Sequence, residues 1–211
     1  MINIGDRSVG GLTYRDQFVG PHQIPVSDNA ITLSNFDSLS GEAMAMGEKS
    51  PIAINNPVAA GKLALAEATL NLLSSGVKKL SDIKISANWM ASPDNNERKT
   101  DLFLTVKELT QSLCKPWKIT IPVGKDSLSM KTIWQKDKKT NLSPQSLIIS
   151  AFSKIGNIKK SITPQLINDK KLVLVYLDLA DKKKRLGGSI FSEVTQQNLT
   201  ETPNLECEDK F

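Results

Sequence analysis

The stretch NPVAAGKLALAEATLNLLSSG, residues 56–76, predicts a strong helix and decides how the rest of the fold must be built around it. Asn56 can cap its start, Pro57 suits the first turn and Gly76 ends it. On a helical wheel with about 100° per residue, apolar side chains form two stripes on opposite sides. One stripe contains Ala59, Leu63, Ala66, Leu70 and Leu73, and the other contains Leu65, Ala68 and Leu72. A helix that is apolar on two sides is expected to be covered on both, so we expect Glu67 to be partly buried.

Two polar residues of this helix, Glu67 and Asn71, lie one turn apart in a gap beside the first stripe. Their neighbours Ala60 and Ala64 are small and leave room above them. A partly buried carboxylate is costly unless it is paired or binds a metal ion. The wheel leaves open the alternative that both residues simply face solvent on a narrow polar strip.

A second carboxylate comes from the segment QIPVSDNAITL, residues 23–33, whose alternating pattern predicts a strand. One face of this strand, expected to point inward, carries Ile24, Val26, Asp28 and Ala30. Together with Glu67 and Asn71, Asp28 would give two carboxylates and one amide oxygen. These are hard ligands of the kind that Mg²⁺ takes while it keeps waters and phosphate oxygens. The alternative for Asp28 is a turn residue that hydrogen-bonds to its own backbone.

The remaining segments alternate between strand and helix patterns, which predicts an α/β fold. The glycine-rich opening predicts an extended loop, and AMAMGEKSPIAI, residues 43–54, predicts a strand pair broken near Gly47. Residues 97–113 carry apolar side chains at helical spacing. Further strands are expected at IKISANWMAS (83–92), KITIPV (118–123) and SLIISAF (146–152), with a hairpin-like turn through 136–141.

The C-terminal part has the pattern of a second, incomplete domain. Residues 164–171 predict a linker, and KLVLVYLDLA, residues 171–180, is almost continuously apolar, as a central strand buried on both faces would be. GGSIFSEVTQQ, residues 187–197, could start a helix. One strand and one short helix cannot close a core, so we expect a domain at 1–167 and the truncated start of another at 168–211.

The segment TIPVGKDSLSM, residues 120–130, contains a Gly-Lys pair but does not match the Walker A pattern. That pattern needs a glycine five residues before the pair, where this chain has Ile119. The preceding residues predict a strand, which cannot supply the nest of N–H donors that wraps a phosphate chain. What remains is a strand end that presents Lys125, Asp126 and Ser127.

Composition and residue patterns argue against several other classes of protein. The net charge of +5 comes from short lysine clusters at expected turns, without interleaved aromatic residues, which favours a solvated surface over a nucleic-acid site. There is no apolar run of the roughly 20 residues that span a bilayer and no signal-peptide pattern. Cys114, Cys207 and the single histidine, His22, carry no signature of a cysteine nucleophile or a zinc site. Cytoplasmic residence is the simplest expectation.

Five blocks carry a resemblance to a known family: residues 5–32, GDRSVGGLTYRDQFVGPHQIPVSDNAIT, followed by GEAMAMGEKSPIA, LALAEATLN, IKISANWMAS and IPVGKDSLSMKT. In this order they resemble the large form of phosphoribosylformylglycinamidine synthase, or FGAM synthetase, of purine biosynthesis. The resemblance implies a fold like the N-terminal domain of aminoimidazole ribonucleotide synthetase: a mixed β-sheet with helices packed on one face. The chain is most similar to that domain in the second of the family's two tandem repeats, followed by the start of its C-terminal partner.

The resemblance also implies a reaction and its ligands. ATP phosphorylates the amide oxygen of formylglycinamide ribonucleotide, and ammonia from glutamine then displaces phosphate to give the amidine. Asp28, Glu67 and Asn71 match the family's Mg²⁺ ligands in this repeat, and Ser27 matches a position that touches the ATP or ADP. The family is expected to have alanine at the position of Ser27, so the resemblance implies that Ser27 contacts the nucleotide through its backbone. Lys125 and Asp126, with Asn88 on the neighbouring strand, would lie at the mouth of the nucleotide cleft.

On this basis we expect half of a Mg-nucleotide site in a carbon–nitrogen ligase. The other half, the first repeat and the glutaminase domain would lie outside this chain, which would be inactive alone and could self-associate through uncovered apolar surface. The alternative is a non-catalytic scaffold that holds a structural Mg-ADP. A nucleic-acid-binding module is a third possibility that predicts strongly salt-dependent binding.

Overall fold

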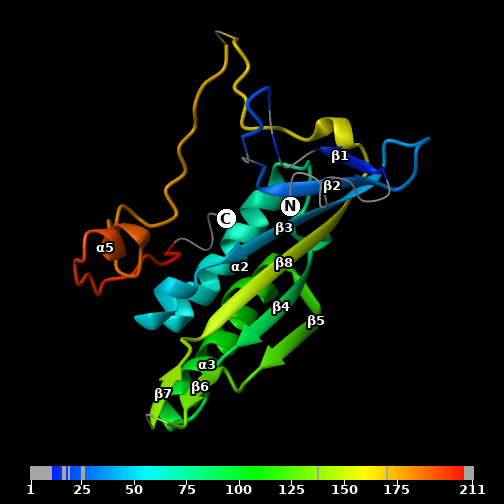
Figure 1. Cartoon of the computed structure of the whole chain (residues 1–211). Helices are drawn as coiled ribbons and strands as arrows, with labels where there is room; N and C mark the ends of the chain where they lie inside the picture. The colour runs from blue at the N-terminus through cyan, green and yellow to red at the C-terminus, as the bar shows by residue number, and fades with distance from the viewer. Residues whose placement is uncertain are drawn as a thin grey trace.

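The computed structural model describes residues 11–15, 18, 20–24, 27–136, 138–169 and 171–206. Its centre is a six-stranded mixed sheet in the order β1-β2-β3-β8-β4-β5, in which only the β4–β5 pair is parallel (Figure 1). The strands are β1 Thr13–Arg15, β2 Asn29–Leu33, β3 Gly41–Glu48, β4 Lys84–Met90, β5 Thr120–Ser127 and β8 Ser146–Ile155. The expected α/β class with a mixed sheet is confirmed.

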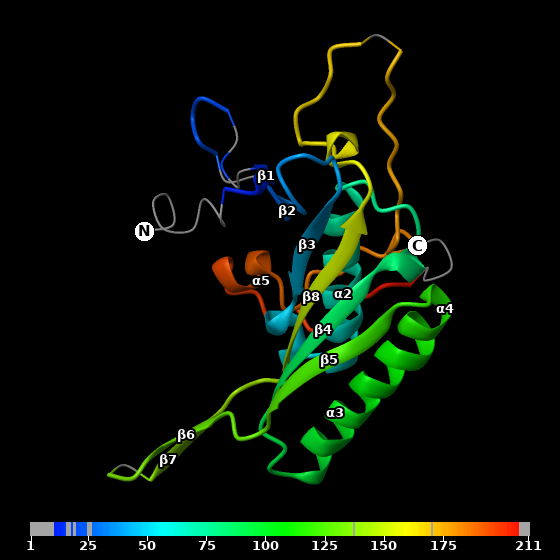
Figure 2. The same cartoon turned by 90° about the vertical axis from the view of Figure 1, so that its right-hand side faces the viewer.

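Two long helices cover one face of this sheet (Figure 2). They are α2, Pro57–Leu73, and α3, Asn96–Glu108, which continues through a π-helical turn, Leu109–Cys114, into α4, Lys115–Trp117. Asn56 caps α2 as the sequence predicts, its side chain accepting from Ala59 N at 2.9 Å. Ten of the helix's residues are buried, which agrees with a helix covered on two sides. Short 3₁₀ turns lie at Ser50–Ile54, Leu80–Asp82 and Ile158–Lys160.

Gly47 does not break a strand pair, contrary to the sequence expectation. β3 runs through it to Glu48 and is followed by the 3₁₀ turn. A Cβ at Gly47 would lie 2.0 Å from the carbonyl oxygen of Ala64 and 2.6 Å from the nitrogen of Ala68. The glycine therefore permits backbone-to-backbone contact between β3 and α2, which is a packing role rather than a turn.

The face assignment of the 23–33 strand is wrong by one residue. β2 begins only at Asn29, and the pairing of Ile31 with Ala43 turns the odd-numbered residues toward α2. Ile31 is completely buried, whereas Asp28 and Ala30 are exposed. Because side chains alternate across a sheet, a shift of one residue exchanges the two faces. Val26 lies outside the described residues.

Two further segments complete the N-terminal part. β6, Lys131–Trp134, and β7, Lys139–Leu142, form the expected hairpin, which projects from the sheet as a separate ribbon (Figure 2).

In the part of the chain described, no helix is long and apolar enough to cross a bilayer.

The predicted central strand at 171–180 is wrong for this structure. Residues 172–177 pair with no strand in the described chain, and every side chain is exposed, from Leu172 at 57% to Leu174 at 88%. A strand that is apolar on both faces needs neighbours on both edges, and this region supplies none. The expected helix is short, α5 Ile190–Val194. Beyond it the chain packs back against the sheet and its helices, where Leu205 is buried in the main core.

Candidate functional site

The outer edge of β3 is left partly uncovered by β2, and α2 completes it. Pairing between these strands stops at Asn29 and Ala45, so the β3 backbone at 46–48 has no β2 partner. Asn71 donates its side-chain amide to the carbonyl oxygen of Met46 at 3.3 Å. Glu67 Oε2 accepts from the backbone N–H of Glu48 at 2.9 Å. The two residues singled out on the helix therefore bind the backbone of one strand edge.

Glu67 also holds a cation. Its Oε1 lies 2.5 Å from Lys49 Nζ, with 38% of the lysine side chain and 32% of the glutamate side chain exposed. Both carboxylate oxygens thus have defined partners, one backbone and one ammonium. The partly exposed position means that this ion pair is weakened by solvent screening. Glu67 therefore does not simply face solvent, because both of its carboxylate oxygens have partners in the protein.

Asp28 directly precedes a residue that contacts α2. This residue, Asn29, donates through Nδ2 to the backbone oxygen of Asn71 at 3.1 Å and also contacts Ser74 Oγ. Asp28 and Ser27 line a cavity of about 220 Å³ whose other lining residues are Arg15, Asn29, Ser74 and Ile162–Pro164. Glu67 and Asn71 do not line this cavity. The structure thus brings the residue next to Asp28 into contact with Asn71, whereas Asp28 itself lines an adjoining cavity.

By their chemistry, the oxygen donors of Glu67, Asn71 and Asp28 suit a hard divalent cation, although Asp28 lines a cavity that the other two do not line. Glu67 and Asp28 offer carboxylate oxygens, and Asn71, whose amide nitrogen is committed to β3, has its oxygen left to meet a cation. Among the described residues no three His, Cys, Asp or Glu side chains gather as a metal centre. A cation here would therefore depend on the Asn71 amide together with waters or phosphate oxygens, as Mg²⁺ commonly does.

Lys125 and Asp126 lie elsewhere on the sheet. They belong to β5, which continues to Ser127, so successive side chains point to opposite faces. Lys125 Nζ donates to Ser127 Oγ at 2.6 Å, while Asp126 is on the other face, in register with Trp89. β5 is separated from β3 by three strand spacings, roughly 14 Å at about 4.8 Å each. Lys125 therefore cannot share a ligand shell with Glu67 in this arrangement.

Asn88 lies in register with Lys125 on β4. Its Oδ1 is buried and has no hydrogen-bond partner within the described structure. An unpaired buried oxygen is unusual in proteins and often marks a place where a ligand or water belongs. Among the described residues of β4 and β5, this unpaired oxygen is the feature that points to a ligand near Lys125.

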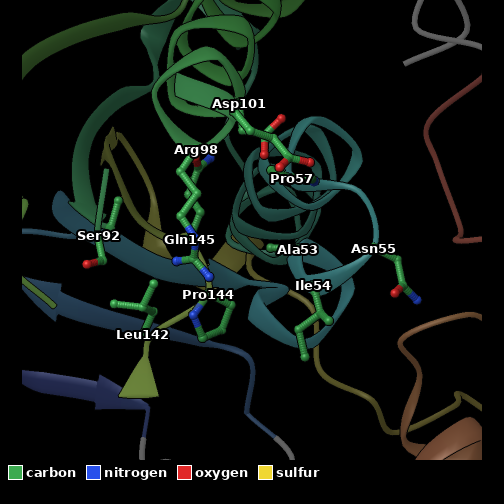
Figure 3. A pocket seen from close by; sticks show the side chains of 12 residues that line it. Ala53, Ile54, Asn55, Pro57, Ser92, Arg98, Asp101, Leu142, Pro144 and Gln145 are labelled. Atoms are coloured by element: carbon green, nitrogen blue, oxygen red, sulfur yellow. The ribbon is translucent and has the colours of Figure 1, made fainter. Parts of the chain in front are cut away.

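Sequence reasoning missed a larger cavity, about 560 Å³, where α2 and α3 begin and β4 ends. Figure 3 shows the Arg98 side chain reaching from α3 toward Gln145 and Pro144, with Asp101 near Pro57. Arg98 donates to Ser143 O at 2.9 Å. The residues that line this cavity come from segments far apart in the sequence, so no local motif could reveal it. They are Ala53–Asn55, Pro57, Ala91, Ser92, Glu97, Arg98, Asp101, Leu142, Pro144 and Gln145.

A cysteine nucleophile finds no support in the described residues. Cys114 is buried at the end of the π-helical turn, and this burial raises its pKa to about 11. The thiol therefore stays protonated at neutral pH, whereas a nucleophilic cysteine must be a thiolate. His22 is exposed in a turn, and Cys207 lies outside the described residues.

The sequence of residues 1–154 matches the model of a family described as the FGAR-AT PurM_N-like domain. The chain belongs to this family. The resemblance of the five sequence blocks to FGAM synthetase is thereby confirmed at the level of the family. Its assignment to the second repeat stays a prediction.

Solved structures share the fold of this FGAR-AT PurM_N-like domain. The chain is 20% identical to PurLQS from Thermotoga maritima, with a TM-score of 0.55, covering 74% of this chain and 23% of that one. It is 19% identical to T. maritima PurL complexed with ATP, with a TM-score of 0.51 and coverage of 67% and 22%. The ADP complex of PurL gives 17% identity, a TM-score of 0.51 and coverage of 72% and 26%. The chain thus spans about a quarter of the length of these structures.

Proposed function

We propose that this FGAR-AT PurM_N-like domain contributes half of a Mg-nucleotide site to an FGAM synthetase. The observation that carries the proposal is at the β3 edge: Glu67 and Asn71 of α2 hydrogen-bond to the β3 backbone, and Asn29, the residue after Asp28, donates to the backbone oxygen of Asn71. Glu67 there already holds a cation, the Lys49 ammonium. The PurL complexes with ATP and ADP, which share the fold, support a nucleotide as the ligand.

The reaction proposed is formation of formylglycinamidine ribonucleotide. ATP transfers its γ-phosphoryl group to the amide oxygen of formylglycinamide ribonucleotide, and ammonia from glutamine displaces phosphate, giving the amidine and ADP. Mg²⁺ bound by Asp28, Glu67 and Asn71 would neutralise polyphosphate charge. The chain's own contribution is positioning: the β3 backbone fixes Glu67 and Asn71, and Ser27 contacts the nucleotide through its backbone.

The second proposed role is a scaffold that keeps Mg-ADP bound without turnover. One observation favours it: Glu67 and Asn71 stabilise the sheet edge by hydrogen bonds to Glu48 and Met46, independently of any ligand. A nucleotide bound there would reinforce the junction of α2, β2 and β3. In both roles the same three side chains hold the cation, so they differ in turnover and not in binding.

We propose that partner domains cover the open face of the sheet. On the face opposite the helices, Met46, Val123 and Phe152 are exposed by 59%, 61% and 39%. An apolar sheet face of this kind requires a second layer. The first synthetase repeat is the proposed occupant, with the substrate and the glutaminase domain bound by the complete enzyme.

A titration of the chain with ADP in the presence of Mg²⁺ tests the proposed site. Binding is expected to be weak, because contacts from the other half are absent, and Glu67→Gln should weaken it further while keeping an acceptor for Glu48 N–H. Asp37→Asn, an exposed acid in the β2–β3 loop, is the control. A sub-micromolar dissociation constant, or an unchanged constant in the Glu67 variant, would show that the site is misplaced.

A further inference from the structure

Lys49 follows the last residue of β3 and points its ammonium group at the proposed metal ligand Glu67. Nζ lies 2.5 Å from Oε1, while the backbone N–H of Glu48 holds Oε2 at 2.9 Å. The neighbouring Glu48 side chain has a partner of its own, since its Oε1 accepts from Ser50 N. One lysine thus meets one oxygen of a carboxylate whose other oxygen is fixed by backbone.

We propose that Lys49 is a built-in competitor for the divalent cation, occupying Glu67 until a metal ion displaces it. This inference rests on the proposed Mg-nucleotide site. A divalent cation and an ammonium group that both lie at contact distance from Glu67 Oε1 repel each other strongly, which disfavours occupancy by both. Binding of a divalent ion at this oxygen therefore favours departure of the Lys49 ammonium.

Lys49 can leave at small cost. Its side chain is 38% exposed, and ion pairs of that exposure are weak because water screens them. Lysine has a long, flexible side chain and a strongly hydrated head group, so its ammonium can swing into solvent. Glu67 would stay in place during the exchange, because the hydrogen bond from Glu48 N–H does not involve Lys49.

The consequence is that the lysine lowers the affinity for a bare metal ion and keeps the carboxylate neutralised when the site is empty. Removing the ammonium should tighten divalent-cation binding by roughly three- to tenfold, combining the lost ion pair with the lost like-charge repulsion. An arginine should act in the opposite sense, since its guanidinium can bind a carboxylate through two hydrogen bonds.

The test is a titration of the chain with Mn²⁺ alone, with free ion measured by electron paramagnetic resonance. Lys49→Met is expected to bind more tightly than wild type and Lys49→Arg more weakly. Lys131→Met is the matched control, because Lys131 pairs with Asp94 at 3.3 Å and its side chain is also 38% exposed. That variant removes the same charge and should leave the affinity unchanged. Circular dichroism checks the fold of each variant.

The outcomes separate the two proposals. If Glu67→Gln abolishes binding but Lys49→Met binds Mn²⁺ no more tightly than wild type, the metal site stands and the competitor role is overturned. If Glu67→Gln binds as wild type does, the proposed metal site fails and the inference fails with it. If Lys49→Met does not fold, the order of wild type and Lys49→Arg decides: equal or tighter binding by the arginine variant overturns the competitor role.

Discussion

Gly47 of β3 and Ala64 of α2 meet backbone to backbone: a Cβ on the glycine would lie 2.0 Å from the alanine carbonyl oxygen. Gly47→Ala must therefore push the helix away from the sheet. Overpacking of this kind costs typically about 1–3 kcal/mol, and more where the opposing atom is rigid backbone. We expect a loss of at least about 3 kcal/mol in the free energy of unfolding, measured by urea denaturation. Gly156→Ala, where the added Cβ would meet nothing within 4 Å, should stay near wild type.

Asp28→Ala in an FGAM synthetase that contains this chain distinguishes the catalytic role from the scaffold role. Asp28 is exposed and lies at the cavity beside Asn29, so its removal should leave the apo fold intact. If the site turns over ATP, amidine formation should fall by two orders of magnitude or more, as for other groups that stabilise charge in a reaction. If the site is a scaffold, turnover should persist while thermal stability in Mg-ADP falls toward that of the apo protein.

Glu206 predicts a pH dependence of the C-terminal packing. Hydrogen bonds from Arg185 and Lys183 lower the pKa of this carboxyl below its usual value. A lowered folded-state pKa means that the contribution is present above the unfolded-state pKa and is lost as pH falls through the folded-state value. The Tm should therefore drop more steeply in wild type than in Glu206→Gln as the pH is lowered below about 4.5, the ordinary value for such a carboxyl. Parallel curves for the two proteins would contradict this.

Cys114 should be almost inert to thiol reagents in the folded chain. Its burial raises the thiol pKa to about 11, so very little thiolate exists at pH 8. In a Cys207→Ser background, reaction with a disulfide reagent should be complete only after addition of denaturant. Rapid labelling under native conditions would show that the core around the π-helical turn opens readily.

The exposed segment 172–177 should promote self-association. Its side chains are apolar and unpaired, which is the composition of a strand edge prone to pairing with another chain. In the antiparallel register that pairs Leu174 of one copy with Val175 of the other, Lys171 of each copy would lie opposite Asp178 of the other. Leu174→Lys should shift the chain toward monomer in sedimentation velocity. Gln165→Lys, which adds the same charge to an exposed position of the preceding loop, should not.

Helices and most strands could be predicted from the sequence because their signals are local. Asn56 caps α2 as expected, and the 97–113 pattern is α3 with its π-helical extension. The position of Asp28 could not be predicted in this way. It depends on the register between β2 and β3, which is a property of the pair and shifts the face of every side chain by one residue.

The candidate site was predictable only in part, for the same reason. Glu67 and Asn71 follow from the helical period, but their partners on β3 do not, because β2 must begin only at Asn29 to leave that edge uncovered. The separation of Lys125 from Glu67 depends on strand order, with β8 and β4 inserted between β3 and β5. The spacing of residues along the chain does not predict this strand order.

The hydrogen bonds from α2 to the backbone of β3 have a consequence for how this protein can change over time. The two helix residues proposed as ligands also complete the sheet. A substitution at either one would disturb the proposed nucleotide site and the sheet together. A lineage that no longer needed nucleotide here would still be under pressure to keep both side chains, so their persistence in a sequence is by itself a poor sign that the site is active.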